Sequence, residues 1–126
     1  MRPSSETLTV QELEIMRVIW STEGATVRDV YEALLDTRSI AYTSVQTMMN
    51  VLLKKGHLAR SPGERAHVYT PTRPKSEVVT SMVREFVQRV FEGSARPLLV
   101  HLASDEGLTA KERRALRALV DGEKKA

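Results

Sequence analysis

The sequence predicts a mainly α-helical protein, in which a winged helix-turn-helix of three helices and a short β-hairpin is followed by C-terminal helices for dimerisation. Two observations carry this prediction. Three short segments with the apolar spacing of helices precede Gly56, and two β-rich runs separated by a Pro-Gly turn follow it. A longer helical segment with a broad apolar stripe comes after the hairpin, and such a stripe needs a second surface to cover it.

Four expected helices begin with a capping box, in which a Thr is followed three residues later by an acid or an amide. The pairs are Thr9 with Glu12, Thr26 with Asp29, Thr43 with Gln46, and Thr109 with Glu112. The first helix is expected over about 9–21 and the second over about 26–36, with Gly24 between them. Their inward positions are Leu13, Met16, Ile19 and Trp20 in the first helix, and Val27, Val30, Tyr31, Leu34 and Leu35 in the second.

The third helix, within residues 41–56, places apolar and polar side chains on opposite faces. Thr43 is expected to cap its start, and Gly56 ends it after two lysines. The apolar stripe consists of Val45, Met48, Met49, Leu52 and Leu53. The opposite face carries Thr43, Gln46, Thr47, Asn50 and Lys54. A helix of this kind presents its polar face to a partner outside the protein.

The β-hairpin after the third helix is expected to form the wing. Leu58–Arg60 and Ala66–Thr70 are its two strands, and residues 61–64 suit a type II turn in which Gly63 supplies a positive φ. Arg60, Arg65 and His67 lie on or near this turn, where they could contact phosphates or a minor groove. The alternative is an exposed hairpin that only closes the core.

Positive charge is concentrated around the third helix and the hairpin. Residues 37–75 carry seven Lys or Arg and a single acid, whereas the net charge of the whole chain is only +3. A one-sided basic patch is typical of a protein that binds a polyanion, and nucleic acid is the common one. A solvated basic face is the alternative.

The composition excludes several other classes of protein. The chain of 126 residues has no Cys, which excludes a disulfide framework, a thiolate metal site and a cysteine nucleophile. Its three His fall in separate elements, and motifs of metalloproteases, phosphate loops and serine hydrolases are absent, so we expect no enzyme, no metal and no cofactor. Without an apolar run of membrane-spanning length or a signal peptide, a cytoplasmic location is expected.

The C-terminal half is expected to form a dimer. Pro71 and Pro74 mark a boundary, which gives a winged-helix domain at 1–73 and a helical dimerisation region at 74–126. One long helix is expected over Lys75–Glu92, followed by helical segments at 97–103 and 109–122. Packing of the long helix on its own winged-helix core is the alternative. The residues expected at the dimer interface are Val78, Val79, Met82, Val83, Phe86, Val87, Val90, Phe91, Leu98, Leu99, Leu102, Leu116 and Leu119.

The chain resembles the penicillinase-repressor family of the BlaI and MecI type. The resemblance lies in LTVQELEIMRVIW at 8–20, TVRDVYEALL at 26–35, AYTSVQTMMNVLLKKG at 41–56, RAHVYTP at 65–71 and PLLVHLASDEGLT at 97–109. It implies a homodimeric repressor whose third helix enters the major groove of a palindromic operator, with Thr43, Gln46, Thr47 and Asn50 facing the bases. Gln and Asn side chains can pair with adenine. Taken with the flanking cations, the expected DNA contacts are Tyr42, Thr43, Ser44, Gln46, Thr47, Asn50, Lys54, Lys55, Arg60, Arg65 and His67.

The resemblance also implies a mechanism of induction. In the family, a membrane-bound sensor protease cuts an Asn–Phe bond in the dimerisation region, and the cut loosens the dimer. The matching bond here joins His101 to Leu102, which keeps the large apolar residue but lacks the Asn. Copper-responsive relatives use C-terminal cysteines, which this chain does not have. Control by a small-molecule ligand and a winged helix used only for protein contacts are the two other hypotheses.

Overall fold

The computed structural model of the chain describes residues 7–104 and 107–125, which form two compact units. The first unit reaches to Met82 and the second begins at Val83. The division between these units falls inside a helix, α4 (Lys75–Phe91). Within the described residues, no helix is both long enough and apolar enough to cross a membrane.

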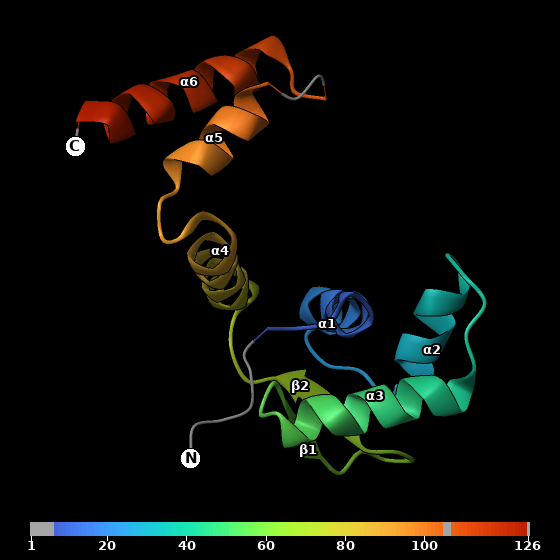
Figure 1. Cartoon of the computed structure of the whole chain (residues 1–126). Coiled ribbons are helices and arrows are strands. Elements are labelled where there is room, and N and C mark those ends of the chain that lie inside the picture. The colour runs from blue at the N-terminus through green and yellow to red at the C-terminus, as the bar shows by residue number, and fades with distance from the viewer. Residues whose placement is uncertain (1–6, 105–106, 126) are drawn as a thin grey trace. The chain divides into compact units, whose positions relative to one another are not determined.

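The first unit is a winged helix. It contains α1 (Val10–Thr22), α2 (Val27–Leu35), α3 (Tyr42–Lys54), β1 (Leu58–Ser61) and β2 (Val68–Pro71), as Figure 1 shows. The two strands are antiparallel, with Leu58 opposite Pro71 and Ser61 opposite Val68. Ala25 forms an isolated antiparallel β-bridge with Tyr69 of β2, through two backbone hydrogen bonds of 2.8 and 3.0 Å. The predicted order of three helices followed by a hairpin is confirmed.

The apolar faces of the helices meet in one core, where α1 packs against α2, α3 and β2. The predicted stripe of α3 is confirmed, because Val45, Met49 and Leu52 are fully buried while Met48 and Leu53 pack at the edge of the core. The side chains of α1 that meet them are Ile15, Met16 and Ile19, also fully buried. Of the positions expected to face inward on α2, Leu35 is exposed because it lies at the last residue of the helix.

Three of the four capping boxes form as predicted. In each of them, the Thr hydroxyl accepts a hydrogen bond from the backbone amide of the acidic residue three positions later. The carboxylate of that residue accepts a hydrogen bond from the backbone amide of the Thr. The predicted capping box of Thr43 and Gln46 is wrong: α3 begins two residues earlier, with Ala41 as its N-cap and without a side-chain cap. The Val45 amide donates to the Ala41 carbonyl, which places Thr43 inside the helix. The side chains of Thr43 and Gln46 are therefore exposed on the face of α3.

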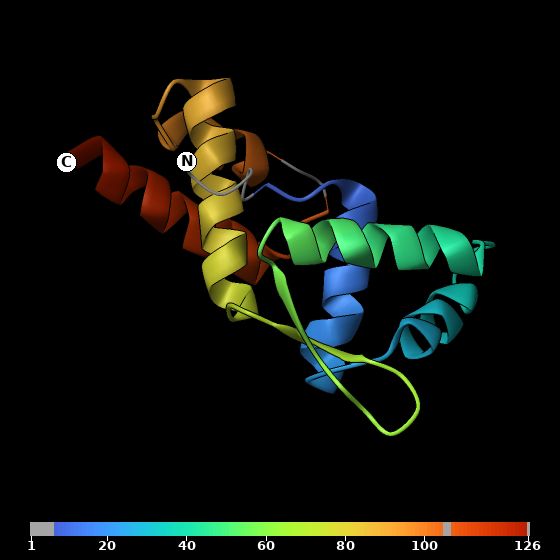
Figure 2. The same ribbon diagram turned by 90° about the horizontal axis from the view of Figure 1, so that it is seen from below.

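The predicted type II turn of the wing is also wrong. Gly63 does not adopt a positive φ, and the strands are joined by an irregular loop of residues 62–67, seen as the open loop in Figure 2. Strand β2 accordingly begins at Val68 rather than Ala66. Glycine is needed at position 63 for space, because a Cβ there would lie 2.4 Å from the carbonyl oxygen of Ala66.

The first turns of α4 belong to the core of the winged helix. Val78 is only 2% exposed within this core, and Met82 packs against its edge. The Trp20 indole donates to the carbonyl oxygen of Arg73 at 3.1 Å, which fastens the start of α4 to α1. Val78 and Met82 were predicted at the dimer interface; in the structure Val78 is buried in the core of its own chain and Met82 is partly covered by it.

The second unit consists of the end of α4, α5 (Arg96–Ala103) and α6 (Ala110–Lys125). Helices α5 and α6 pack against each other, and Arg113 of α6 donates to the carbonyl oxygen of Ala103 at 2.7 Å. Phe91 meets Phe86 edge to face, with ring centroids 5.9 Å apart. Among the described residues of this unit, none is fully buried, and Val83, Phe86 and Val90 are about half exposed.

Candidate nucleic-acid interface

The outer face of α3 is polar and exposed. Since Val45, Met49 and Leu52 are buried against the core, the helical repeat turns the opposite side chains toward solvent. The residues predicted to contact DNA from this face are all exposed, namely Thr43, Ser44, Gln46, Thr47, Asn50 and Lys54. A continuous row of hydroxyl, amide and ammonium groups is suited to reading the edges of bases and their phosphates.

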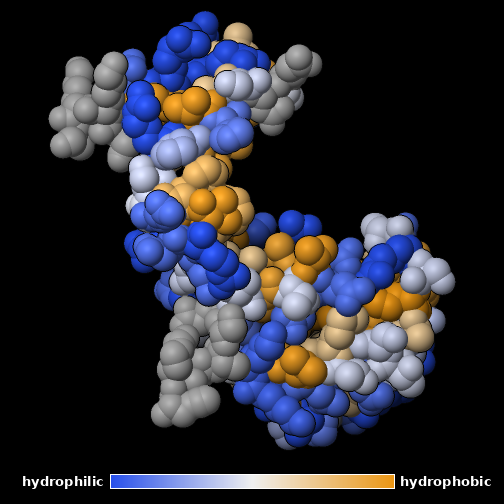
Figure 3. Space-filling view, in the orientation of Figure 1, coloured by the Kyte–Doolittle hydropathy of each residue, from blue (hydrophilic) through white to orange (hydrophobic). Residues whose placement is uncertain are grey.

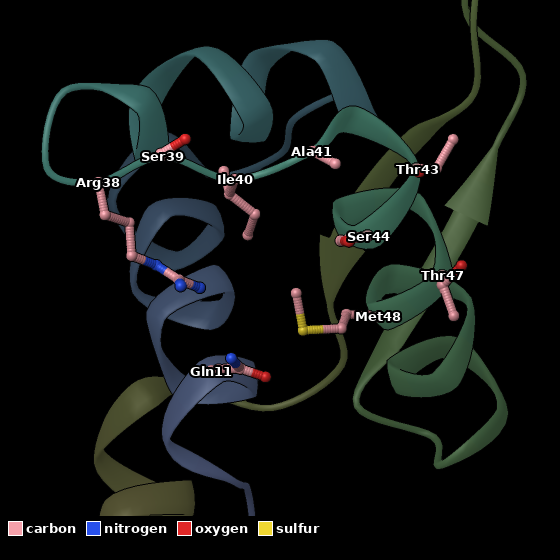
Figure 4. A pocket seen from close by; sticks show the side chains of 9 residues that line it. All are labelled: Gln11, Arg38, Ser39, Ile40, Ala41, Thr43, Ser44, Thr47 and Met48. Atoms are coloured by element: carbon pink, nitrogen blue, oxygen red, sulfur yellow. The ribbon is translucent and has the colours of Figure 1, made fainter.

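One side of this face borders a hollow of about 600 Å³ between α1, the segment 38–41 and the first turns of α3. In Figure 4, Gln11 and Arg38 reach into the hollow from the side opposite α3, whereas Thr43 and Thr47 lie along α3. Arg38 forms an ion pair of 3.1 Å with Glu14. Sequence reasoning counted Arg38 in the basic segment but did not place it beside the polar face of α3.

The other side of the face borders a second hollow, of about 620 Å³, which the wing completes. Tyr42 and Gln46 of α3 line it together with Arg65 and His67 of the loop, so the structure brings these predicted residues to one place. The start of α2 forms its third wall through residues 26–28. Arg28 in this wall was missed by the sequence analysis, because it lies outside the basic segment 37–75.

Tyr42 connects α2 to α3 at this second hollow. Its ring meets the ring of Tyr31 at 76°, with centroids 5.4 Å apart, and it is half-buried. The guanidinium carbon of Arg28 lies 5.6 Å from the centroid of the same ring. Tyr42 is therefore part of a small aromatic and cationic cluster, which fixes its position at the first residue of α3.

The predicted cations of the interface divide into two groups. Lys54, Arg60, Arg65 and His67 are exposed, on α3, β1 and the loop between the strands. Lys55 instead turns inward, where its ammonium group lies 2.9 and 3.0 Å from the two carboxylate oxygens of Glu12. The side chain thus holds the end of α3 against α1, while the expected contact of Lys55 with DNA stays a prediction.

Glu12 has two roles in this arrangement. It closes the capping box of α1 and also pairs with Lys55, and its side chain is only 7% exposed, against 22% for Lys55. Burial alone would raise the pKa of Glu12. The hydrogen bonds from the Thr9 amide and Lys55, together with the charge of Lys55, outweigh this effect and hold the pKa below its usual value. The carboxylate is therefore charged at neutral pH, and it orients the C-terminal end of α3.

Several known proteins resemble this chain. The family model described as penicillinase repressor matches residues 8–122. A relative from Mycobacterium tuberculosis, the transcriptional regulator BlaI, is 38% identical over 115 residues, covering 88% of this chain and 83% of the relative. The penicillinase repressor of Bacillus licheniformis is 27% identical over 113 residues, covering 90% of this chain and 88% of the relative.

Two solved structures resemble the first unit. The solution structure of the DNA binding domain of the repressor BlaI has a TM-score of 0.54 and 32% identity, covering 60% of this chain and 93% of that domain. The solution structure of monomeric Bacillus licheniformis BlaI in complex with the blaP half-operator has a TM-score of 0.50 and 34% identity. It covers 56% of this chain and 87% of the solved one. These likenesses agree with the winged-helix fold of the first unit.

The pair of Glu12 and Lys55 gives a testable prediction. Glu12→Gln keeps a residue that can close the capping box but removes the charge, and should lower the free energy of unfolding by about 2 kcal/mol at neutral pH. Because the folded-state pKa is lowered, this stabilisation is present above the unfolded pKa of about 4.3 and is lost as the pH falls through the folded value. Urea unfolding at several pH values measures both effects.

The matched control is Glu32→Gln, which removes an exposed carboxylate of α2 and should change the free energy of unfolding by less than about 0.5 kcal/mol. A Glu12→Gln variant as stable as the original chain at neutral pH would contradict the structural role of the pair. A deficit that grows toward acid pH would contradict the direction of the pKa shift.

Proposed function

Because the chain belongs to the penicillinase-repressor family of DNA-binding transcriptional repressors, we propose that it binds a palindromic operator as a homodimer. Each copy inserts α3 into the major groove of one half-site, and the wing contacts the flanking backbone. The two half-sites lie on one face of the duplex, about one helical turn (~10 base pairs) or a multiple of it apart.

The observation that carries this proposal is the exposed polar face of α3, bordered by two hollows and by exposed cations. Both hollows are open depressions lined in part by predicted DNA contacts, which favours a duplex rather than a small ligand as their occupant. The Bacillus licheniformis relative was solved with a half-operator, which supports double-stranded DNA as the partner of this chain as well. Gln46 and Asn50 read bases, while Lys54, Arg60 and Arg65 neutralise phosphates.

The proposed dimer forms through the apolar side chains that the structure leaves exposed. Val83, Phe86 and Val90 are about half exposed along the end of α4. Figure 3 shows hydrophobic side chains on the surface of α4 and of α5 with α6. Apolar surface of this extent in a small unit needs a partner. The remaining residues of the proposed interface are Val79, Val87, Phe91, Leu98, Leu99, Leu102, Leu116 and Leu119, all exposed or half-buried.

The proposed induction step is cleavage between His101 and Leu102. Both side chains are exposed, and the bond lies in the last turn of α5, where the Ser104 amide donates to the carbonyl oxygens of Val100 and His101. A protease binds its substrate in an extended conformation, so this last turn must unwind first. A helix of eight residues, none of which is fully buried, can open locally at low cost. Cleavage there would separate α6 from the rest of the proposed interface.

Base reading by α3 gives the first prediction of this function. Gln46→Ala and Asn50→Ala should each reduce the preference for the operator over a random duplex by roughly ten-fold or more, since a good bidentate contact is worth about 1–3 kcal/mol of discrimination. Lys54→Ala is the control, because it should weaken binding to both duplexes alike. Gel mobility shifts with the chain's own promoter and a random duplex measure the preference. An equal loss of affinity for both duplexes in the Gln46 and Asn50 variants would indicate that these side chains contact the DNA backbone and not the bases.

Dimerisation gives the second prediction. The chain should sediment as a dimer at micromolar concentration without DNA, and Phe86→Glu should shift it to the monomer, because it introduces a charge into the apolar surface. The same variant should lose affinity for a two-half-site duplex more than for a single half-site. Gln88→Glu adds the same charge at an exposed polar position of α4 and should stay dimeric. A monomeric wild-type chain would rule out the proposed dimer.

Cleavage gives the third prediction. Incubation with a sensor protease encoded beside the chain should produce a fragment ending at His101, identified by its mass. Leu102→Asp should resist, because it replaces the large apolar residue after the bond with a charged one. Since Leu102 also belongs to the proposed dimer interface, Phe86→Glu, which should be monomeric but keeps the bond, is the control and should still be cut. A chain that stays intact, or one cut at another bond, would refute the assignment of this site.

A further inference from the structure

We propose that Arg28, at the start of α2, binds a backbone phosphate of the DNA, that Tyr42 holds its guanidinium in place, and that Glu32 restrains it. This inference rests on the proposed function and adds to it one phosphate contact, made by Arg28, and one residue that weakens this contact, Glu32. Arg28 lies in the wall of the hollow between α2, α3 and the wing, and its side chain is 66% exposed.

The position of this hollow places it on the path of one DNA strand. With α3 in the major groove and the wing against the flanking backbone, the strand between these two contacts passes over the space that separates them. That space is the hollow of about 620 Å³ lined by residues of α2, α3 and the loop. A strand carries a phosphate about every 3.4 Å, so a phosphate passes close to Arg28.

The amides at the start of α2 cannot serve this phosphate well. The Asp29 amide donates to the Thr26 hydroxyl, and the Thr26 amide donates to the Asp29 carboxylate. The carboxylate also places a negative charge at this end of the helix. A phosphate here therefore needs a cationic side chain, and of the two arginines that line the hollow, Arg28 is the one on a helix.

Tyr42 gives the Arg28 side chain a defined position. The Tyr42 ring is fixed on one side by the edge-to-face contact with Tyr31, and the guanidinium of Arg28 lies 5.6 Å from its centroid. A guanidinium resting on an aromatic ring keeps its N–H groups in one plane, which is suited to pairing with two oxygens of a phosphate. Less conformational entropy is then lost when the phosphate binds.

Glu32 competes with the phosphate for the same guanidinium. It lies one helical turn after Arg28, with a carboxylate oxygen 3.5 Å from the Arg28 guanidinium, and both side chains are more than 60% exposed. An exposed pair of this kind contributes little stability, so a phosphate can replace the carboxylate. The displaced carboxylate then repels the phosphate, which lowers the affinity of every site by a similar factor.

The experiment measures binding of the full chain to a random-sequence duplex and to its own promoter at several salt concentrations. Arg28→Ala should weaken binding to both duplexes by roughly ten-fold and lower the salt dependence by about one unit per half-site. The affinity of Arg28→Lys should fall between that of the original chain and that of Arg28→Ala, since it keeps the charge but loses the planar group. Glu32→Gln should strengthen binding to both duplexes by roughly two- to five-fold.

Arg17→Ala is the matched control, because Arg17 is an exposed arginine of α1 beside Trp20 and Pro74, in another hollow of the same unit. It should leave the salt dependence unchanged. The role of Tyr42 is tested by a double-mutant cycle, in which Arg28→Ala should cost less in a Tyr42→Leu background than in the original chain. Thermal unfolding monitors the fold of each variant.

The proposal is overturned if Arg28→Ala keeps the salt dependence of the original chain, or if Glu32→Gln weakens binding. The proposed function fails in a different way, when the original chain shows no preference for its promoter over the random duplex. The response of random-duplex binding to Arg28→Ala can be measured in either case, so the two failures are distinguishable.

Discussion

The packing of α3 on α1 is the constraint on which the rest of the interface depends. Val45, Met49 and Leu52 are fully buried in the same core as Ile15, Met16 and Ile19, and a helix with one face buried in this way cannot rotate about its axis. Glu12 and Lys55 fix the C-terminal end of α3, and Tyr42 and Tyr31 fix its first residue. The polar face of α3 points to solvent because the helix is held at both ends by these contacts and along its length by its buried apolar face.

Most of the fold was predictable from local patterns. Apolar spacing and capping boxes identified the helices, and the turn residues marked the hairpin, because these signals act within a few residues of the chain. The failures have tertiary causes. Helix α3 starts at Tyr42, whose ring packs on Tyr31, and Val78 lies in the core, where the Trp20 indole also holds the segment before α4. Neither contact has a signal in the residues near it in sequence.

The candidate site was predictable only in part, for a similar reason. The exposed face of α3 follows from the helical repeat, so the exposure of residues such as Gln46 and Asn50 was predictable. Lys55 had the charge of a DNA contact, but its partner Glu12 is 43 residues away. Arg28 was missed because only the spatial approach of α2 to the wing brings it into the hollow beside α3. Counting charge along the chain locates a basic segment, but the role of each cation in it depends on the residues that surround the cation in space.

The wing shows how binding strength could evolve separately from stability. Residues 59–67 are all exposed, so changes of charge there carry little penalty for folding. Gly63 is the exception, since a side chain at this position would collide with the backbone at Ala66. Single substitutions elsewhere in this loop can therefore change the charge of the wing while Gly63 is kept. Selection could adjust how firmly a gene is silenced without first finding a compensating change in the core.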